Sequence, residues 1–341
     1  MRNDDPARKR PARPLTRPSE ADRRLWAIVL AGGEGVRLRS LVRLVCGENR
    51  PKQYVPLLES RSLLQQTLDR VALRIPTEQT VIVTMRGHAR YMPDPFHNRQ
   101  GPQVLTQPEN RGTAAGVLLP AHWIAWRDPE ATVAVFPSDH FVLGEATFME
   151  HVAGVAEWID RHPDRLCLLG VQPSGPETEY GWIEPGEAPD EARTGSISHV
   201  RRFWEKPSDV TAQACLTRGA LWNTLVMVAK VATLVDAGYQ HVPAMSDRLG
   251  HIEPFEGSEE EPWAMQQAYA LMPTANFSRA VLEPCPPYLA VSSLPRITWS
   301  DLGTPRRVLA VIQRLRVRPP WLRTRAGLAQ LAAPEGIPFY G

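Results

Sequence analysis

Three glycines and an arginine follow an apolar run near the start of the sequence. The stretch LAGGEGVRL spans residues 30–38 and comes directly after the apolar residues 25–29. Glycine lets backbone N–H groups approach an anion closely, and Arg37 adds a fixed positive charge. A second cation, Lys52, follows in the stretch RPK across an intervening loop. The pattern predicts a polyphosphate-binding loop, with an ordinary tight turn after a strand as the alternative.

Two widespread phosphate-binding loops do not fit this spacing. The loop GxxxxGK[ST] needs a lysine beside its last glycine, and the dinucleotide fingerprint GxGxxG needs a glycine where this chain has Leu38. The candidate glycines are therefore Gly32, Gly33 and Gly35, in a loop of another kind.

A carboxylate with metal-binding potential follows the apolar run 132–136. Asp139 should lie at the carboxyl end of a sheet, where open α/β folds bind ligands. Magnesium binds through one or two carboxylates plus phosphates and waters, so a second aspartate should converge on the same point. The alternative role of Asp139 is a helix N-cap. His140, next in the chain, is expected to pack or to form a hydrogen bond rather than to bind a metal.

The composition is that of a globular protein with one basic region. The chain has 341 residues, of which 43% are apolar, and its formal charge of +2 excludes a broad electrostatic field for nucleic acid. Residues 1–24 combine charges and prolines with few large apolar side chains, which predicts a disordered basic tail. The sequence has neither a signal-peptide pattern nor a run of about 18 apolar residues, so we expect a cytoplasmic protein without a membrane partner.

Cysteines and histidines are spaced too widely for a disulfide framework or a transition-metal cage. There is no CxxC, HxH or HExxH pattern, which favours reduced core thiols. The four cysteines are Cys46, Cys167, Cys215 and Cys285.

Strand-like and helix-like runs alternate through the first half of the chain, as in βαβ units. The expected strands are 27–30, 80–83, 103–106, 132–136, 166–171, 180–184, 197–205, 221–228 and 288–291, and the expected helices are 62–74, 113–126, 146–160 and 305–315. Strands apolar on both faces indicate a parallel sheet covered by helices. The prediction is an α/β, Rossmann-like fold with a mostly parallel central sheet flanked by helices, to which a mixed, partly antiparallel sugar-binding region is added. We expect one domain over 25–316 and a C-terminal appendage over 317–341.

Seven stretches occur in the order typical of one family. LAGGEGVRL with RPKQYVPL resembles the pattern LAGGxGTRL…PKQF of the sugar-nucleotidyltransferase family, most closely its mannose-1-phosphate guanylyltransferase branch. The other six are QPENRGTAAG, FPSDHFV, GVQPSGPETEYGWIEPG, VRRFWEKPS, LWNTLVMV and TWSDLG. The resemblance extends over about residues 27–312 and agrees with the predicted fold.

The resemblance implies a reaction and a role for each matching residue. A phosphate oxygen of a sugar-1-phosphate attacks the α-phosphorus of a nucleoside triphosphate, and pyrophosphate leaves. Arg37 would contact the triphosphate, Lys52 would lie near the α-phosphate, and Asp301 would be the second Mg²⁺ ligand beside Asp139. The implied nucleotide-binding residues are Gly32, Gly33, Gly35, Gly112, Thr113 and Ser138. The implied residues for the sugar phosphate are Gly181, Glu205, Lys206 and Asn223.

Several of these residues also have purely structural alternatives. Asp301 could cap the helix 305–315, Glu205 and Lys206 could form a surface ion pair, and Gly181 could mark a bulge. Asn223 could satisfy backbone groups at a strand turn. Trp123 and Trp126, at helical spacing, are expected in the core.

The expected function is the formation of GDP-mannose from GTP and mannose-1-phosphate with Mg²⁺. The family's usual residues are replaced at Val36, at Asn110 with Gly112, and at Thr224 with Leu225. Another sugar-1-phosphate or another nucleotide is therefore the close alternative, and a non-catalytic nucleotide-sugar sensor is the alternative of another class. The oligomeric state is left open, with a homodimer as one option.

Overall fold

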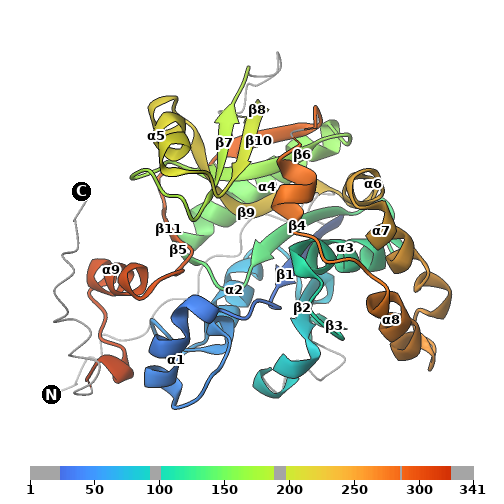
Figure 1. Ribbon diagram of the computed structural model, residues 1–341, viewed down its shortest axis with the longest axis horizontal. Helices are drawn as coiled ribbons and strands as arrows, with labels where there is room; N and C mark the ends of the chain where they lie inside the picture. Colours follow the sequence, from blue (N-terminus) through green and yellow to red (C-terminus); the bar gives the residue numbers. More distant parts are fainter. Residues whose placement is uncertain (1–23, 93–100, 188–196, 285, 324–341) are drawn as a thin grey trace, which may run out of the picture.

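A nine-stranded sheet runs through the centre of the computed structural model, which describes residues 24–92, 101–187, 197–284 and 286–323 (Figure 1). The strands of this sheet are β1 (Leu25–Leu30), β2 (Thr80–Met85), β3 (Gln103–Gln107), β4 (Thr132–Pro137), β6 (Leu166–Val171), β7 (Gly181–Pro185), β8 (Ile197–Glu205), β9 (Leu221–Lys230) and β10 (Leu289–Ser293). Their order is β3-β2-β1-β4-β9-β6-β10-β8-β7.

The two halves of the sheet differ in direction. Strands β1 to β4 are parallel, whereas β9 runs antiparallel to both β4 and β6. One end of β9 also pairs with β7, so that β9, β6, β10, β8 and β7 form a closed ring of pairings. The sequence-based prediction of a parallel sheet with an added mixed region is confirmed.

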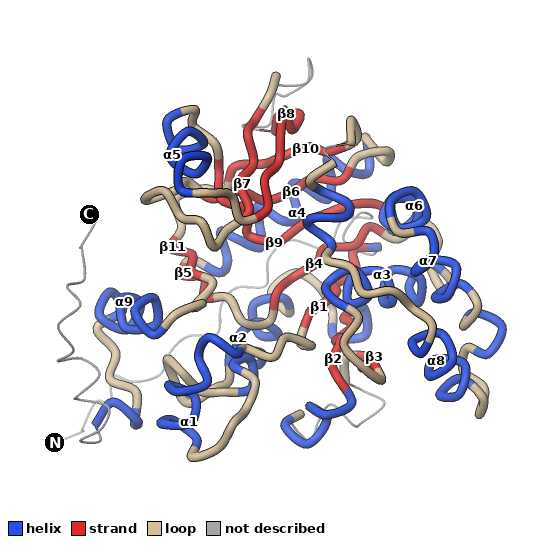
Figure 2. The backbone as a smooth tube through the Cα atoms, in the orientation of Figure 1, coloured by secondary structure: helices blue, strands red, loops and turns tan. Residues whose placement is uncertain are grey.

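Helices cover both faces of the sheet, because the parallel strands are apolar on both sides; β2 and β4 are buried along their whole lengths. The helices are α1 (Arg39–Cys46), α2 (Leu63–Val71), α3 (Gly112–Ala125), α4 (Glu145–Arg161), α5 (Asp209–Thr217), α6 (Val231–His241), α7 (Pro243–Gly250), α8 (Glu261–Ala270) and α9 (Pro305–Leu315). One large apolar cluster packs α3, α6, α7 and α8 on the sheet, and a second packs α2 and α4 on the other face. Figure 2 shows α6, α7 and α8 gathered on one side of the strands, with α1 and α9 on the opposite side.

The segment between Arg37 and Lys52 is not simply a loop, as the sequence interpretation had it. It contains the short 3₁₀ turn η2 (Val36–Leu38) and helix α1, which ends at Gly47 in the left-handed conformation. Leu41 and Val42 of α1 are buried in a third apolar cluster shared with α9. This tertiary packing stabilises a helix too short to form alone.

A two-stranded antiparallel ribbon lies beside the main sheet. It is formed by β5 (Phe141–Leu143) and β11 (Thr298–Ser300). Helix α9 follows β11, and a 3₁₀ turn, η9 (Pro320–Arg323), follows α9. Trp321 of η9 is buried, and its indole N–H donates to the carbonyl oxygen of Leu57 at 3.0 Å.

The predicted tail and most of the predicted appendage lie outside the described residues, so the domain boundaries stay predictions. None of the described helices is long and apolar enough to cross a membrane. Cys46, Cys167 and Cys215 are free thiols, and Cys285 lies outside the described residues. Trp123 is buried as expected and packs edge-on against Trp26.

Candidate active site

The glycine-rich loop is held by the residues that follow Lys52. The side-chain amide of Gln53 donates to the carbonyl oxygens of Ala31 at 2.8 Å and Gly33 at 2.9 Å, and the Tyr54 hydroxyl donates to Ala31 at 3.0 Å. In a trans peptide the next N–H points opposite to the carbonyl. The N–H groups of Gly32 and Glu34 are therefore turned away from Gln53, as an anion-binding loop requires.

Gly35 has a different role from its neighbours. Its φ of +59° lies in the left-handed region, and a Cβ there would come within 3.1 Å of the backbone nitrogen of Lys52. The missing side chain lets the loop pack directly on the segment that carries Lys52.

Lys52 joins the two aspartates that the sequence proposed as metal ligands. Its buried ammonium group lies 3.2 Å from Asp139 Oδ2 and donates to the carbonyl oxygen of Asp301 at 2.6 Å. Asp139 precedes β5, and Asp301 follows β11, so the ribbon brings the two together. Neither is a helix cap: Asp139 precedes a strand, and Thr304 caps α9 by accepting from the N–H of Arg307.

The Asp301 carboxylate is the most heavily bonded acid of this centre. Oδ1 accepts from the Tyr180 hydroxyl at 2.9 Å and from the Gly303 N–H at 3.0 Å, and Oδ2 accepts from Arg307 at 3.0 Å. Burial by itself raises the pKa of Asp301, but Arg307, His140 and Lys52 outweigh it and hold the pKa below its usual value. Asp301 is therefore an anion at neutral pH.

Further ion pairs reach the centre from the loop before β7. Arg37 contacts Glu179 at 2.7 Å and Asp301 Oδ2 at 3.7 Å, and Arg307 contacts Glu177 at 2.7 Å. The sequence interpretation did not select these glutamates or Arg307. The onset of the 305–315 helix was the one available signal, because the first turn of a helix that follows Asp301 so closely can reach back to it.

Three of the four residues proposed for the sugar phosphate converge on one point. A Cβ at Gly181 would lie 3.1 Å from Glu205 Oε2 and 3.2 Å from the Cβ of Asn223. Gly181 pairs in regular register with Glu205, so it does not mark a bulge. Burial raises the pKa of Glu205, against the lowering effect of Lys206.

Lys206 and Asn223 are shaped by unusual backbone. Lys206 has a φ of +52° and is exposed, and its N–H donates to the carbonyl oxygen of Tyr180 at 3.2 Å. Asn223 Oδ1 accepts from the N–H of Leu225, which has a φ of +59°. Asn223 thus satisfies a strand turn, as its structural alternative foresaw, and its amide nitrogen has no partner among the described residues.

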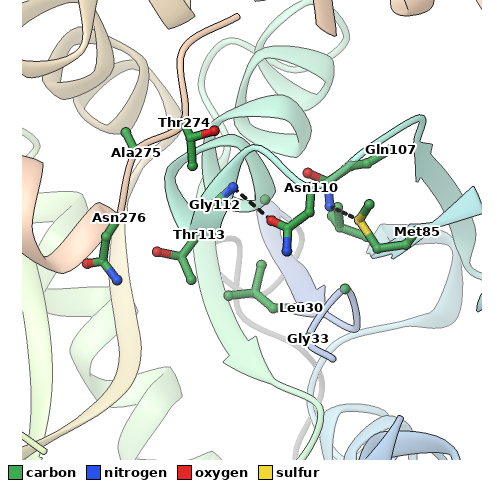
Figure 3. A pocket seen from close by; sticks show the side chains of 13 residues that line it. Leu30, Gly33, Met85, Gln107, Asn110, Gly112, Thr113, Thr274, Ala275 and Asn276 are labelled. Atoms are coloured by element: carbon green, nitrogen blue, oxygen red, sulfur yellow. Dashed lines mark hydrogen bonds between the residues drawn. The ribbon is translucent and has the colours of Figure 1, made fainter. Parts of the chain in front are cut away.

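A pocket of ≈ 280 Å³ opens above the glycine-rich loop (Figure 3). Gly32, Gly33, Gly112 and Thr113 line it, together with Met85, Gln107, Asn110 and the segment 274–276. The sequence interpretation did not select Gln107 or Asn110, although both lie in a stretch that it had matched to the family.

The side-chain amides of the pocket have fixed orientations. Gln107 Oε1 accepts from the Tyr269 hydroxyl at 3.1 Å, which leaves its NH₂ group only the sulfur of Met85, at 3.6 Å. Asn110 Oδ1 accepts from the Gly112 N–H at 2.9 Å, which turns its NH₂ group away from that bond. Both amides therefore offer donors to a ligand.

Two residues proposed for the nucleotide have structural roles. Gly112 has a φ of +83°, and a Cβ there would lie 2.1 Å from the carbonyl oxygen of Ala275, so its main role is a close backbone crossing. Ser138 is buried, and its hydroxyl donates to the carbonyl oxygen of Leu30 at 2.6 Å, which joins β4 to β1. The site therefore contains Gly112 as a wall and Ser138 as a support below it.

The acidic residues fit a magnesium ion held partly by substrate. Within the described ranges no three His, Cys, Asp or Glu side chains are placed to enclose a metal ion. Asp139 keeps 27% of its side chain exposed, and Asp301 Oδ2 has fewer donors than Oδ1. Two carboxylates open to one side suit Mg²⁺, which takes its other ligands from phosphates and water. His140 packs edge-on against Trp299.

Comparison with known proteins decides the family. Residues 26–317 match the family model described as nucleotidyl transferase. The chain belongs to the nucleotidyl transferase family. A crystal structure from Thermus thermophilus, named mannose-1-phosphate geranyltransferase, is 30% identical with a TM-score of 0.72, covering 87% of this chain and 80% of that one. The expected fold and family are thus confirmed.

Curated relatives of this nucleotidyl transferase are longer than the chain itself. Xanthan biosynthesis protein XanB of Xanthomonas campestris pv. campestris is 29% identical over 294 residues, which are 84% of this chain and 59% of XanB. Mannose-1-phosphate guanylyltransferase of Escherichia coli K12 is 26% identical over 296 residues, which are 83% of this chain and 59% of that protein. The chain therefore spans about three fifths of the length of these relatives.

Proposed function

We propose that the protein transfers a nucleotidyl group from a nucleoside triphosphate to a sugar-1-phosphate and releases pyrophosphate. The observation that carries the proposal is the position of Lys52 between Asp139 and Asp301. These residues come from the loop and ribbon between the nucleotide-sized pocket and the cluster of Gly181, Glu205 and Asn223. Two phosphorylated substrates can then meet over one charged centre.

The transfer needs positioning and charge rather than a nucleophilic side chain. The attacking phosphate oxygen is already ionised, so no general base is required. Lys52 would oppose the charge on the α-phosphate, and Arg37 would leave Glu179 to bind the outer phosphates. The glycine loop would donate backbone N–H groups to the same phosphates.

Asp139 and Asp301 would hold the Mg²⁺ ion of this reaction. When bound, the ion supplies positive charge to the phosphate oxygens. Arg307 and Tyr180 orient Asp301 for this task, because they fix one edge of its carboxylate and leave Oδ2 toward Arg37.

The nucleotide we favour is GTP. Gln107, Asn110 and Thr113 present donors to the pocket; the Thr113 hydroxyl accepts from the N–H of Phe277, so its own proton is available. Guanine offers O6 and N7 as neighbouring acceptors, whereas adenine and cytosine place an amino group there. Uracil and thymine also offer a carbonyl, so a pyrimidine nucleotide is the second candidate.

The sugar we favour is mannose-1-phosphate, in line with the names of the relatives. The experiment measures pyrophosphate release by the purified protein with Mg²⁺, in a grid of nucleoside triphosphates against mannose-, glucose-, galactose- and heptose-1-phosphates. Preference for GTP with mannose-1-phosphate is the expected result. Another preferred pair would keep the reaction and replace the substrates. Nucleotide binding without turnover across the grid would contradict the proposal and favour a sensor.

A further inference from the structure

A second cavity, of ≈ 500 Å³, lies outside the proposed active site. Arg296 contributes from the segment before β11, and Arg314 contributes from the last turn of α9. Neither guanidinium has an ion pair or hydrogen bond within the described part of the chain. Two cations without an acidic partner, facing one cavity, favour an anionic occupant.

The rest of the lining is mostly apolar. Leu143, Leu294 and Ile297 contribute, and Leu143 keeps 46% of its surface exposed. Thr298 and Gln172 add polar groups beside them. A cavity with cations and an apolar wall fits a small organic molecule that carries a phosphate, because such a ligand uses both surfaces.

The cavity is connected to the charged centre by the β5–β11 ribbon. Leu143 and Thr298 form the ribbon's pair at the cavity, and Phe141 and Ser300 form the pair at the other end, next to the proposed metal ligands. The ribbon is three pairs long, roughly 10 Å. A ligand that shifts one end moves the residues that carry Asp139 and Asp301.

Helix α9 makes a second connection (Figure 1). Arg307 in its first turn contacts Asp301, and Arg314 lines the cavity two turns later. Positions seven residues apart lie on the same face of a helix. Gln172, at the end of β6, leads into the loop that carries Glu177 and Glu179. The ribbon, α9 and the segment after β6 therefore each link this cavity to the charged centre around Asp301.

We propose that this cavity is an effector site for a small phosphate monoester, and that its occupancy changes the rate of nucleotidyl transfer. The binding part stands on the cavity alone. The effect on rate rests on the proposed function, so the two parts are measured separately.

The binding experiment uses phenyl phosphate as the probe, with inorganic phosphate and phenol as reference compounds, and isothermal titration calorimetry of the full chain. One variant carries R296A and R314A together. K52M reports on the proposed active site, and R248A, on α7 at the opposite side of the molecule, is the matched arginine control (Figure 1). Melting temperatures check that each variant is folded.

The expected result is that phenyl phosphate binds more tightly than either reference compound. The double variant should weaken binding about tenfold or more, whereas K52M and R248A should stay within about twofold. Binding that K52M removes and the double variant keeps would assign the probe to the catalytic centre and overturn the proposal. Absence of binding to the wild-type chain at millimolar concentration would overturn it as well.

The rate experiment measures pyrophosphate release with and without saturating phenyl phosphate. We expect a change of at least about threefold in kcat/KM for the wild-type chain and none for the R296A and R314A variant, whose rate without probe should equal that of wild type. An unchanged wild-type rate despite binding would refute the regulation. A chain that binds the probe but has no transferase activity would refute the proposed function and leave the binding site standing.

Discussion

Asp139 and Asp301 share Lys52 but differ in how their carboxylates are held. Asp301 accepts from Tyr180, Gly303 and Arg307, whereas Asp139 contacts Lys52 and lies 3.7 Å from His140. Asp139 is therefore the carboxylate with more freedom to meet a ligand, and its charge can be removed at little structural cost.

Asp139→Asn should keep the fold and lower kcat/KM by at least about 10², because it removes a fixed charge from the reacting centre. Steady-state pyrophosphate release over a range of Mg²⁺ concentrations measures the loss, and the melting temperature checks the fold. Asp164→Asn, whose carboxylate is 71% exposed, is the control. Activity of the Asp139 variant near that of wild type would remove Asp139 from the centre.

The glycines lining the nucleotide pocket give a contrast between steric and chemical roles. Gly112→Ala places a Cβ against the carbonyl oxygen of Ala275 at a φ of +83°, so it should lower the free energy of unfolding by about 2 kcal/mol or more. Gly33→Ala meets no atom within 4 Å and should leave stability nearly unchanged. Urea denaturation compares the two. Equal stability of the variants would show that the crossing at Gly112 is not rigid.

At the scale of elements, the third apolar cluster supports the active-site loops. Leu38 of this cluster follows Arg37, Leu302 follows Asp301, and Trp321 packs with them. The cluster therefore couples the C-terminal turn η9 to the loops that carry the charges.

Trp321→Ala should lower the free energy of unfolding by about 3 kcal/mol, since it empties a buried site and leaves the carbonyl oxygen of Leu57 without its donor. It should also reduce kcat, because the loops around Leu38 and Leu302 lose support. Trp263→Ala on α8, where the ring is 59% exposed, is the matched control. A Trp321 variant as stable as the control would mean that η9 is not part of the folding unit.

The strands were predictable because their periodicity is strong. The run 132–136 is apolar throughout and became β4, buried on both faces. Helix α1 and the helices α6 to α8 were not predicted, because packing against distant segments, rather than local pattern, stabilises them. The site motifs were found where they are contiguous. The contact between Tyr180 and Asp301 joins residues 121 positions apart, which no local pattern reveals.

At the scale of the whole molecule, buried histidines set the response to acid. His122 packs against the rings of Trp126 and Tyr239, and burial lowers its pKa to about 4. The unfolded chain takes up this proton near the ordinary value of 6.5, whereas the folded chain does not. The folded state therefore loses stability as the pH falls from about 6.5 toward 4.

His122→Phe should remove most of this loss, about 3 kcal/mol between pH 7 and pH 4, while keeping the ring packing. Denaturant midpoints at a series of pH values give the slope for wild type and variant. Parallel curves would show that other groups dominate the acid response. Burial also lowers the pKa of His151 and His241, so some pH dependence should remain in the variant.

Strand β10 sets the order in which the sheet can be completed. It is inserted between β6 and β8, yet it comes some 90 residues after β8 in the chain. During synthesis on the ribosome, β6 and β8 each present an unpaired edge until residue 293 has emerged. A nascent chain that stalls before this point carries two adhesive edges, so its fate depends on chaperones or on rapid completion of translation.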